Sequence, residues 1–106
     1  MAEPRTRYRE LVTLTTHAVL DGRGVTASQL RWAAFHRRID ELPAELRTYV
    51  QTVAANAWRV TDEDVNALKR AGHSEDAIFE VTAAAALGAA IMRMERGLIV
   101  LEESRA

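Results

Sequence analysis

The chain has 106 residues, 48% of them hydrophobic, and a net charge of −1; this length fits a single domain over 1–106. It contains no cysteine, which excludes disulfides, thiolate nucleophiles, thiol redox cycling and cysteine metal ligands. The polar start MAEPRTRYRE lacks the apolar core of a signal peptide. The longest uncharged run, 81–92, is about half of what spans a bilayer. We therefore expect a cytoplasmic protein that does not cross a membrane.

Charge is distributed unevenly along the chain. Residues 1–60 carry nine arginines and six acids, a net charge of +3, whereas residues 61–106 carry five basic and nine acidic residues, a net charge of −4. This asymmetry can favour docking between the two halves or between subunits. Solvated faces of opposite sign explain it equally well.

Two helices are predicted in the first part of the chain. Apolar residues at helical spacing indicate a helix from Pro4 to about Leu20, which Gly22 helps to end. Thr26 to Gln29 then fits a capping box, in which a hydroxyl and an amide satisfy free N–H groups at a helix start. The second helix is predicted to stop near Leu42, because a proline follows.

Two further helices are predicted in the middle of the chain. The first covers 43–58, with proline in its first turn and an apolar side that includes Trp58. Thr61 is predicted to cap the next helix, whose first turn holds the acids Asp62 to Asp64. Capping and the helix dipole account for these acids without catalysis. Gly72 ends that helix.

The last helix is predicted to be long and rich in alanine. Ser74 caps it, and the stretch 81–92 is apolar all round, which predicts burial on every side. A glycine such as Gly88 costs about 1 kcal/mol in a helix, so close packing of a neighbouring backbone is expected to offset that cost. A helix with contacts on all sides in a short chain suggests an oligomer. The predicted inward stripe consists of Ile78, Val81, Ala85, Met92 and Ile99.

The run ALKRAGHSEDAIFEVTAAAALGAA, Ala67 to Ala90, resembles the carboxymuconolactone decarboxylase and AhpD-like alkylhydroperoxidase superfamily. The shared pattern is a helix, an Ala-Gly turn, a Ser-acid-acid cap and a helix of small residues, and the best-matched part is 61–103. The resemblance implies an all-α, single-domain bundle of about five helices with a long C-terminal Ala-rich helix. It also implies assembly as a trimer or a multiple of a trimer.

The chain departs from that family at the residues of the peroxidase reaction. Peroxidase members carry C-x-x-C and then a histidine upstream of the glycine turn, and these positions fall here on Ala57, Val60 and Asp64. Without thiolates the hydroperoxide cannot be reduced by that mechanism, so thiol peroxidase activity is excluded. Glu45 falls at the place of the family's proton-relay glutamate.

Two hypotheses about function remain. The first is a non-catalytic oligomeric domain that binds a partner or a small-molecule ligand. The second is a thiol-independent, decarboxylase-like acid–base enzyme acting on a small carboxylated substrate. In that enzyme Glu45 or Asp64 would be the base and Arg59 would hold the carboxylate, with His36 and Arg93 as ligand-binding residues.

No metal, cofactor or nucleic acid is expected. The three histidines and three methionines are scattered, and a methionine such as Met92 is more often core filler than a ligand. His73 lies between a helix stop and a cap, where we expect exposure. A recognition helix starting at Glu75 and Asp76 would repel phosphates, which argues against binding to DNA or RNA.

Overall fold

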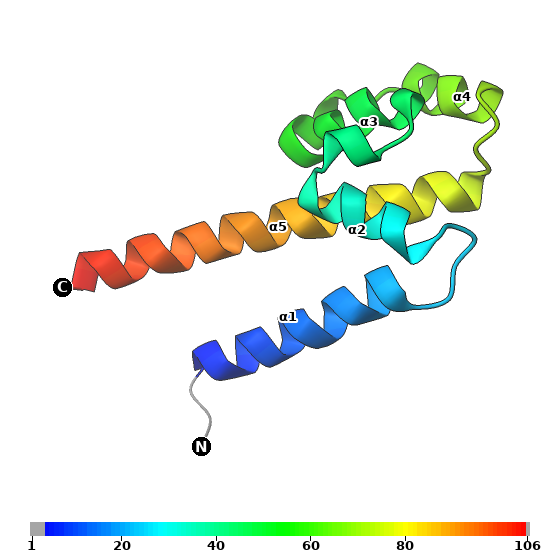
Figure 1. The fold of residues 1–106 in the computed structure, drawn as a ribbon. Helices are drawn as coiled ribbons and strands as arrows, with labels where there is room; N and C mark the ends of the chain where they lie inside the picture. Colours follow the sequence, from blue (N-terminus) through cyan, green and yellow to red (C-terminus); the bar gives the residue numbers. More distant parts are fainter. Residues whose placement is uncertain (1–3, 106) are drawn as a thin grey trace.

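The structure is a computed structural model that describes residues 4–105, and over this range the chain contains helices and no strand (Figure 1). The predicted all-α class and the long C-terminal helix are confirmed. Short 3₁₀ turns follow the second and third α-helices. The elements are α1 Pro4–Asp21, α2 Ser28–His36, η1 Ile39–Glu41, α3 Ala44–Asn56, η2 Ala57–Arg59, α4 Asp62–Arg70 and α5 Glu75–Arg105.

Helix α5 is the central helix, against which the other four α-helices pack. Its N-terminal half packs against α2 and α3, while α1 runs antiparallel to it on another side (Figure 1). The ion pair between Arg5 and Glu102 joins the start of α1 to the end of α5. Beyond α2 and α3 the C-terminal half of α5 continues with α1 beside it, and the chain measures 51 × 28 × 23 Å. We call this two-helix extension the arm.

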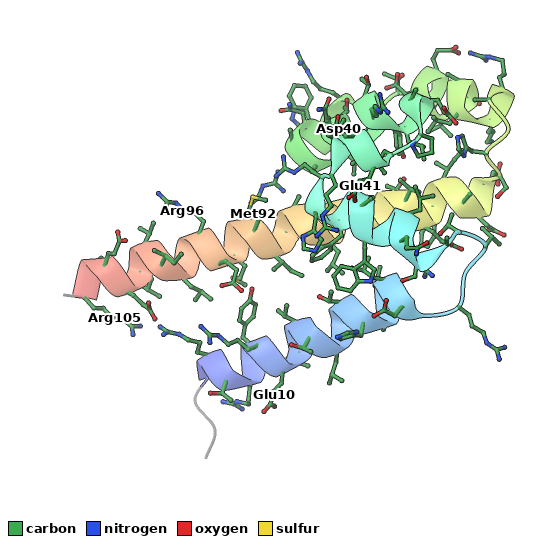
Figure 2. The ribbon with its side chains drawn as sticks, viewed as in Figure 1. Glu10, Asp40, Glu41, Met92, Arg96 and Arg105 are labelled. Carbon is green, nitrogen blue, oxygen red and sulfur yellow. The ribbon has the colours of Figure 1, made fainter. Side chains whose placement is uncertain are left out.

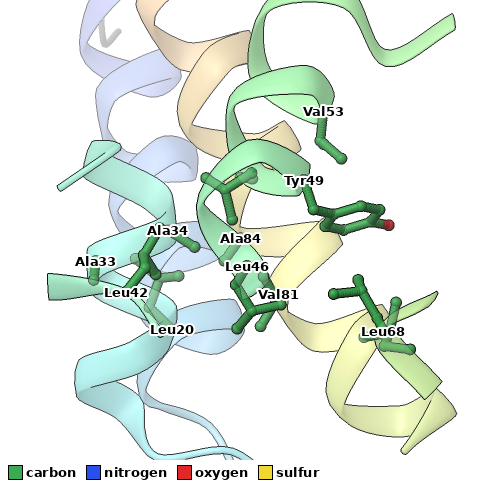
Figure 3. Packing of buried hydrophobic residues seen from close by; sticks show 13 residues of the cluster. Leu20, Ala33, Ala34, Leu42, Leu46, Tyr49, Val53, Leu68, Val81 and Ala84 are labelled. Atoms are coloured by element: carbon green, nitrogen blue, oxygen red, sulfur yellow. The ribbon is translucent and has the colours of Figure 1, made fainter. Parts of the chain in front are cut away.

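The hydrophobic core lies where α2, α3 and α5 meet (Figure 3). Its fully buried large side chains come from three helices, α1, α3 and α5, and burying each one contributes about 2 kcal/mol. Leu68 of α4 and Ile78 of α5 extend the core toward the α4–α5 turn. The fully buried large residues are Leu20, Leu46, Val50 and Val81.

Gly88 lets α2 and α5 approach closely. A Cβ atom at this position would overlap the carbonyl group of Phe35 in α2. The prediction that close packing of a neighbouring backbone offsets the cost of this glycine is therefore confirmed.

The predicted caps of α4 and α5 are present. The Asp64 backbone N–H donates to Thr61 Oγ1 at 3.2 Å, and the Thr61 N–H donates to Asp64 Oδ2 at 2.9 Å, which completes a capping box. Ser74 Oγ accepts a hydrogen bond from the Ala77 N–H at 3.1 Å. Gly72 has φ of +103°, the left-handed conformation that favours glycine after a helix.

The predicted capping box at the start of α2 is wrong. Ala27 is the N-cap, and it makes no side-chain cap hydrogen bond. The Thr26 backbone N–H, which the Gln29 amide oxygen would accept in a capping box, donates instead to the Glu80 carboxylate of α5 at 2.9 Å, and the Thr26 hydroxyl donates to the same carboxylate at 2.5 Å. A carboxylate accepts a stronger hydrogen bond than an amide does, so this tertiary partner replaces the local one.

The predicted end of α2 near Leu42 is also wrong. The helix ends at His36 because Arg37 adopts the left-handed conformation, with φ of 53°, and its N–H bonds to the carbonyl of Ala34. A separate 3₁₀ turn, η1, then leads to α3. Nothing in the sequence marks Arg37 for this conformation, which glycine or asparagine usually adopts.

Three residues predicted to face inward are exposed in the isolated chain. Trp58 is 80% exposed at η2, Met92 is 55% exposed and Ile99 is 45% exposed. The stretch 81–92 is likewise not buried on every side, because Ala86 and Ala90 are exposed. For Met92 and Ile99 the cause is the length of α5, whose C-terminal half extends past α2 and α3.

Among residues 4–105, α5 is the one helix long and apolar enough to cross a membrane by length and composition alone. Its most apolar stretch of 18 residues has a mean hydropathy of 1.5, and 33% of that stretch is buried within the chain. Core helices of water-soluble proteins pass the same test, so this property is weak support for a membrane span.

Candidate functional site

A cavity of about 160 Å³ opens between α3 and α4. It contains two of the predicted catalytic residues, because Glu45 lies in the first turn of α3 and Asp64 in the first turn of α4. Hydroxyl groups line the rest of its polar wall. The lining residues are Glu45, Thr48, Tyr49, Thr52, Asp64, Ala67 and Leu68.

Glu45 is hydrogen-bonded to a histidine that the sequence did not connect with it. Its Oε1 atom lies 2.8 Å from His73 Nε2. The Glu45 backbone N–H and then His73 hold the pKa of the Glu45 carboxyl below its usual range. The expected exposure of His73 is wrong, since 19% of its side chain is exposed. Helix α3 lies close enough to the α4–α5 turn for this contact, a proximity that only the tertiary structure creates.

The Asp64 carboxylate forms part of the N-terminal capping box of its own helix, α4. Its Oδ2 atom accepts the Thr61 N–H in the capping box, so the capping role proposed from the sequence is the one observed. Proton transfer to this oxygen would compete with the cap at the start of α4.

A short chain of hydroxyl groups lies behind the cavity. The Tyr49 hydroxyl is 2.6 Å from Thr82 Oγ1, and Thr82 in turn donates to the Ile78 carbonyl at 2.6 Å. Tyr49 belongs to the hydrophobic core, because it is 8% exposed. Its hydroxyl group reaches α5, and helical periodicity carries no signal for such a contact.

The other predicted site residues lie elsewhere. Arg59 stacks over the Trp58 ring, 5.3 Å from its centroid, and does not line the cavity. His36 is exposed and stacks on Trp32 with a centroid distance of 5.5 Å. Arg93 Nη2 donates to the Ala54 carbonyl at 2.7 Å and so joins α5 to the last turn of α3. The five predicted residues therefore do not form one site.

The positions at which the family's thiols would lie are not enclosed. Ala57 is exposed, and Val60 is partly buried against the hydrophobic core. The cavity lies to the other side of η2, between α3 and α4.

The cavity suits anionic substrates poorly. No arginine or lysine lines it, while two carboxylates do. A carboxylated substrate would meet repulsion from Glu45 and Asp64 without a cation to hold it. The lowered pKa of Glu45 also makes it a weak general base at neutral pH.

Exposed apolar side chains form the second feature of the surface. Most of those among the described residues lie on α1 and on the C-terminal half of α5, the two helices of the arm, whereas Val25, Trp58 and Phe79 lie outside it. Large apolar surfaces of this kind commonly mark binding to another protein. The exposed large residues of the arm are Leu11, Leu14, Met92, Met94, Ile99, Val100 and Leu101.

Comparisons of the chain with protein-family models, with curated proteins and with solved structures found no match. The resemblance to the AhpD-like superfamily therefore stays a prediction.

Proposed function

We propose that the chain is a non-catalytic, AhpD-like helical subunit that functions by assembling with copies of itself. The assembly is a trimer or a multiple of a trimer, as the family resemblance implies. The surface of the arm carries this proposal, and the cavity between α3 and α4 plays no part in it.

The main support for this proposal is that the isolated chain exposes more surface than a compact monomer of the same mass. It exposes 7250 Å², whereas a compact monomer of 11.8 kDa exposes about 5900 Å². Its radius of gyration of 15.6 Å likewise exceeds the roughly 13 Å of a compact domain of this length. A standard protein interface buries about 800 Å² per partner. The surplus is large enough for such an interface, and the arm exposes seven large apolar side chains that could be buried in it.

Sedimentation velocity over a range of concentrations tests the proposal. We expect a particle that contains three chains of 11.8 kDa, or a multiple of three, at micromolar concentration. A monomer throughout the range up to about 100 μM, where a weak association with Kd near that value would show, would contradict it.

The acid–base alternative is supported by one observation, the hydrogen bond between Glu45 and His73 beside the cavity. A carboxylate bound to an imidazole can pass a proton between them. Because the cavity is acidic, its ligand under this alternative would carry hydroxyl or amino groups. A thermal-shift screen of such compounds, repeated on Glu45→Gln, tests it. A shift that Glu45→Gln abolishes would support the alternative, and no shift from any compound would contradict it.

A further inference from the structure

We infer that one contact in the assembly is a two-fold, antiparallel pairing of the C-terminal halves of α5 from two copies of this chain. The contact surface is the exposed side of α5 formed by Met92, Arg96, Ile99, Val100 and Glu103, which we call the ledge. This inference rests on the proposed function and specifies the surface through which two copies meet.

The ledge is one continuous side of a helix. Residues 92, 96, 99 and 103 follow the spacing that places side chains above one another on a helix, and all four are exposed. Figure 2 shows Met92 and Arg96 projecting from α5 on the side away from α1. Helix α1 therefore does not cover this surface, and α2 and α3 end before it.

The charges of the ledge are complementary to themselves in an antiparallel arrangement. Its basic residue, Arg96, precedes the apolar pair Ile99 and Val100, and its acidic residue, Glu103, follows that pair. A two-fold axis between Ile99 and Val100 reverses one helix relative to the other. It places Ile99 against Val100 of the second copy and Arg96 against Glu103 of the second copy, once on each side of the axis. A parallel pairing would place like charges together.

Neither charge is used by its own chain. Within residues 4–105, Arg96 and Glu103 take part in no salt bridge. They lie seven residues apart on the same helix, and the described residues contain no ion pair between them. In the antiparallel pairing, each of the two charges faces the opposite charge of the second copy.

Other partners of α5 fit the ledge less well. A bilayer would have to accommodate Arg96 and Glu103 beside the apolar pair, and charges within a membrane are costly. A nucleic acid would be repelled by Glu103. A second ledge satisfies both charges and buries the apolar centre.

A charge-exchange series in the full chain tests the pairing. The variants are Arg96→Glu, Glu103→Arg and the double variant, with Arg23→Glu in the exposed α1–α2 loop as the matched control. Each single exchange converts two attractive contacts per pair into repulsive ones, so we expect at least tenfold weaker association by sedimentation equilibrium. The double variant restores opposite charges and is expected to associate within about threefold of the original chain, as is the control.

A second pair of variants tests the apolar centre. Ile99→Glu places two carboxylates at the axis and is expected to abolish the contact. Phe79→Glu makes the same kind of change at an exposed position in the N-terminal half of α5, outside the arm, and is expected to leave the contact unchanged. Circular dichroism of each variant verifies that its helices are intact.

The outcomes separate this inference from the proposed function. A wild-type hexamer that the single exchanges weaken and the double exchange restores would support the pairing. A wild-type dimer with the same response would support the pairing and contradict the proposed trimer or multiple of a trimer. An oligomer that is indifferent to these changes, or a closed trimer without a two-fold contact, would overturn the pairing and leave the proposed assembly intact. A wild-type chain that stays monomeric would overturn both.

Discussion

Glu80 connects α5 to the loop between α1 and α2. It accepts hydrogen bonds from the Val25 N–H at 2.8 Å, the Thr26 N–H at 2.9 Å and the Thr26 hydroxyl. Gly24 allows this approach, because a Cβ there would lie 2.6 Å from Glu80 Oε1. Burial raises the pKa of Glu80, but the bonds from Thr26 and Val25 outweigh that effect and hold the pKa below its usual range. The ionised carboxylate thus stabilises the loop.

Replacement of this carboxylate is expected to destabilise the fold. Glu80→Ala removes a charged acceptor from three donors and should lower the free energy of unfolding by about 2 kcal/mol, because hydrogen bonds to ionised groups contribute more than neutral ones. Urea denaturation followed by circular dichroism measures it. Glu10→Ala on exposed α1 is the control, expected within about 0.5 kcal/mol of the original chain. Equal stability of the two variants would contradict the role of Glu80.

Stability is expected to fall in acid. Bonds from Trp32, His17 and Ser28 lower the pKa of Asp21 from 3.8 to about 2, and the pKa of Glu80 is lowered from 4.5. The unfolded chain therefore binds more protons in this range, so these contributions are present above about pH 4.5 and are lost as the pH falls toward 2. Urea midpoints between pH 7 and pH 2.5 test this. Asp21→Asn should show a shallower decline, and an identical decline would contradict the assignment.

At the scale of elements, the contact between α2 and α5 depends on one missing side chain. Gly88 lies in the middle of a helix and opposite the carbonyl of Phe35, whereas a Cβ at Gly97 in the same helix would meet no atom within 4 Å. The two glycines share a secondary structure and differ in their neighbours. They therefore separate the effect of packing from that of helix propensity.

Opposite outcomes are expected for alanine at these two glycines. Gly88→Ala must push α2 away from α5 and should destabilise the fold by about 2 kcal/mol or more. Gly97→Ala gains helix propensity and should stabilise it by about 0.5–1 kcal/mol. Thermal and urea unfolding of the two variants provide the measurement. Stabilisation by Gly88→Ala would show that the close approach of α2 is wrong.

The end of α2 offers a second test at this scale. Arg37 holds a left-handed conformation that costs a non-glycine residue about 1 kcal/mol, so Arg37→Gly is expected to stabilise the fold by roughly that amount. The loss of the 3.4 Å contact from Arg37 to Met92 Sδ offsets little, because that contact is exposed. Arg38→Gly, at φ of −79°, is the matched control and should not stabilise. A loss of stability in Arg37→Gly would contradict the assigned conformation.

At the scale of the whole molecule, the arm carries most of the exposed large apolar side chains of the described residues. Helix α1 covers one side of the C-terminal half of α5, and the ledge remains exposed. Binding of a second copy stabilises the folded state by mass action, since an unfolded chain has no ledge to pair.

The thermal midpoint is consequently expected to depend on protein concentration. A hundredfold increase in concentration should raise it by about 5 °C or more. Differential scanning calorimetry of the original chain and of Ile99→Glu makes the comparison, and the variant, which loses one contact of the assembly, should show a midpoint that depends less on concentration. A constant midpoint in both proteins would argue against coupled folding and assembly.

Several features of this fold follow from local chemistry and were therefore predictable from the sequence. Thr61 and Ser74 cap helices through atoms three residues away, and Gly72 ends a helix through its own backbone freedom. Such signals lie within one turn of the residue that carries them. The helical class, the order of the elements and the close packing at Gly88 follow from them and from periodicity.

Only the tertiary structure decided the remaining features, because each depends on residues far apart in the chain. Thr26 bonds to Glu80 across 54 positions instead of capping its own helix, and His73 meets Glu45 across 28 positions. Apolar periodicity assigned Ile99 to an inward side, but which side of a long helix is covered depends on where its neighbours end. The sequence thus determined the helical class and the caps of α4 and α5, and the packing of α2 and α3 decided where the core stops and the exposed ledge begins.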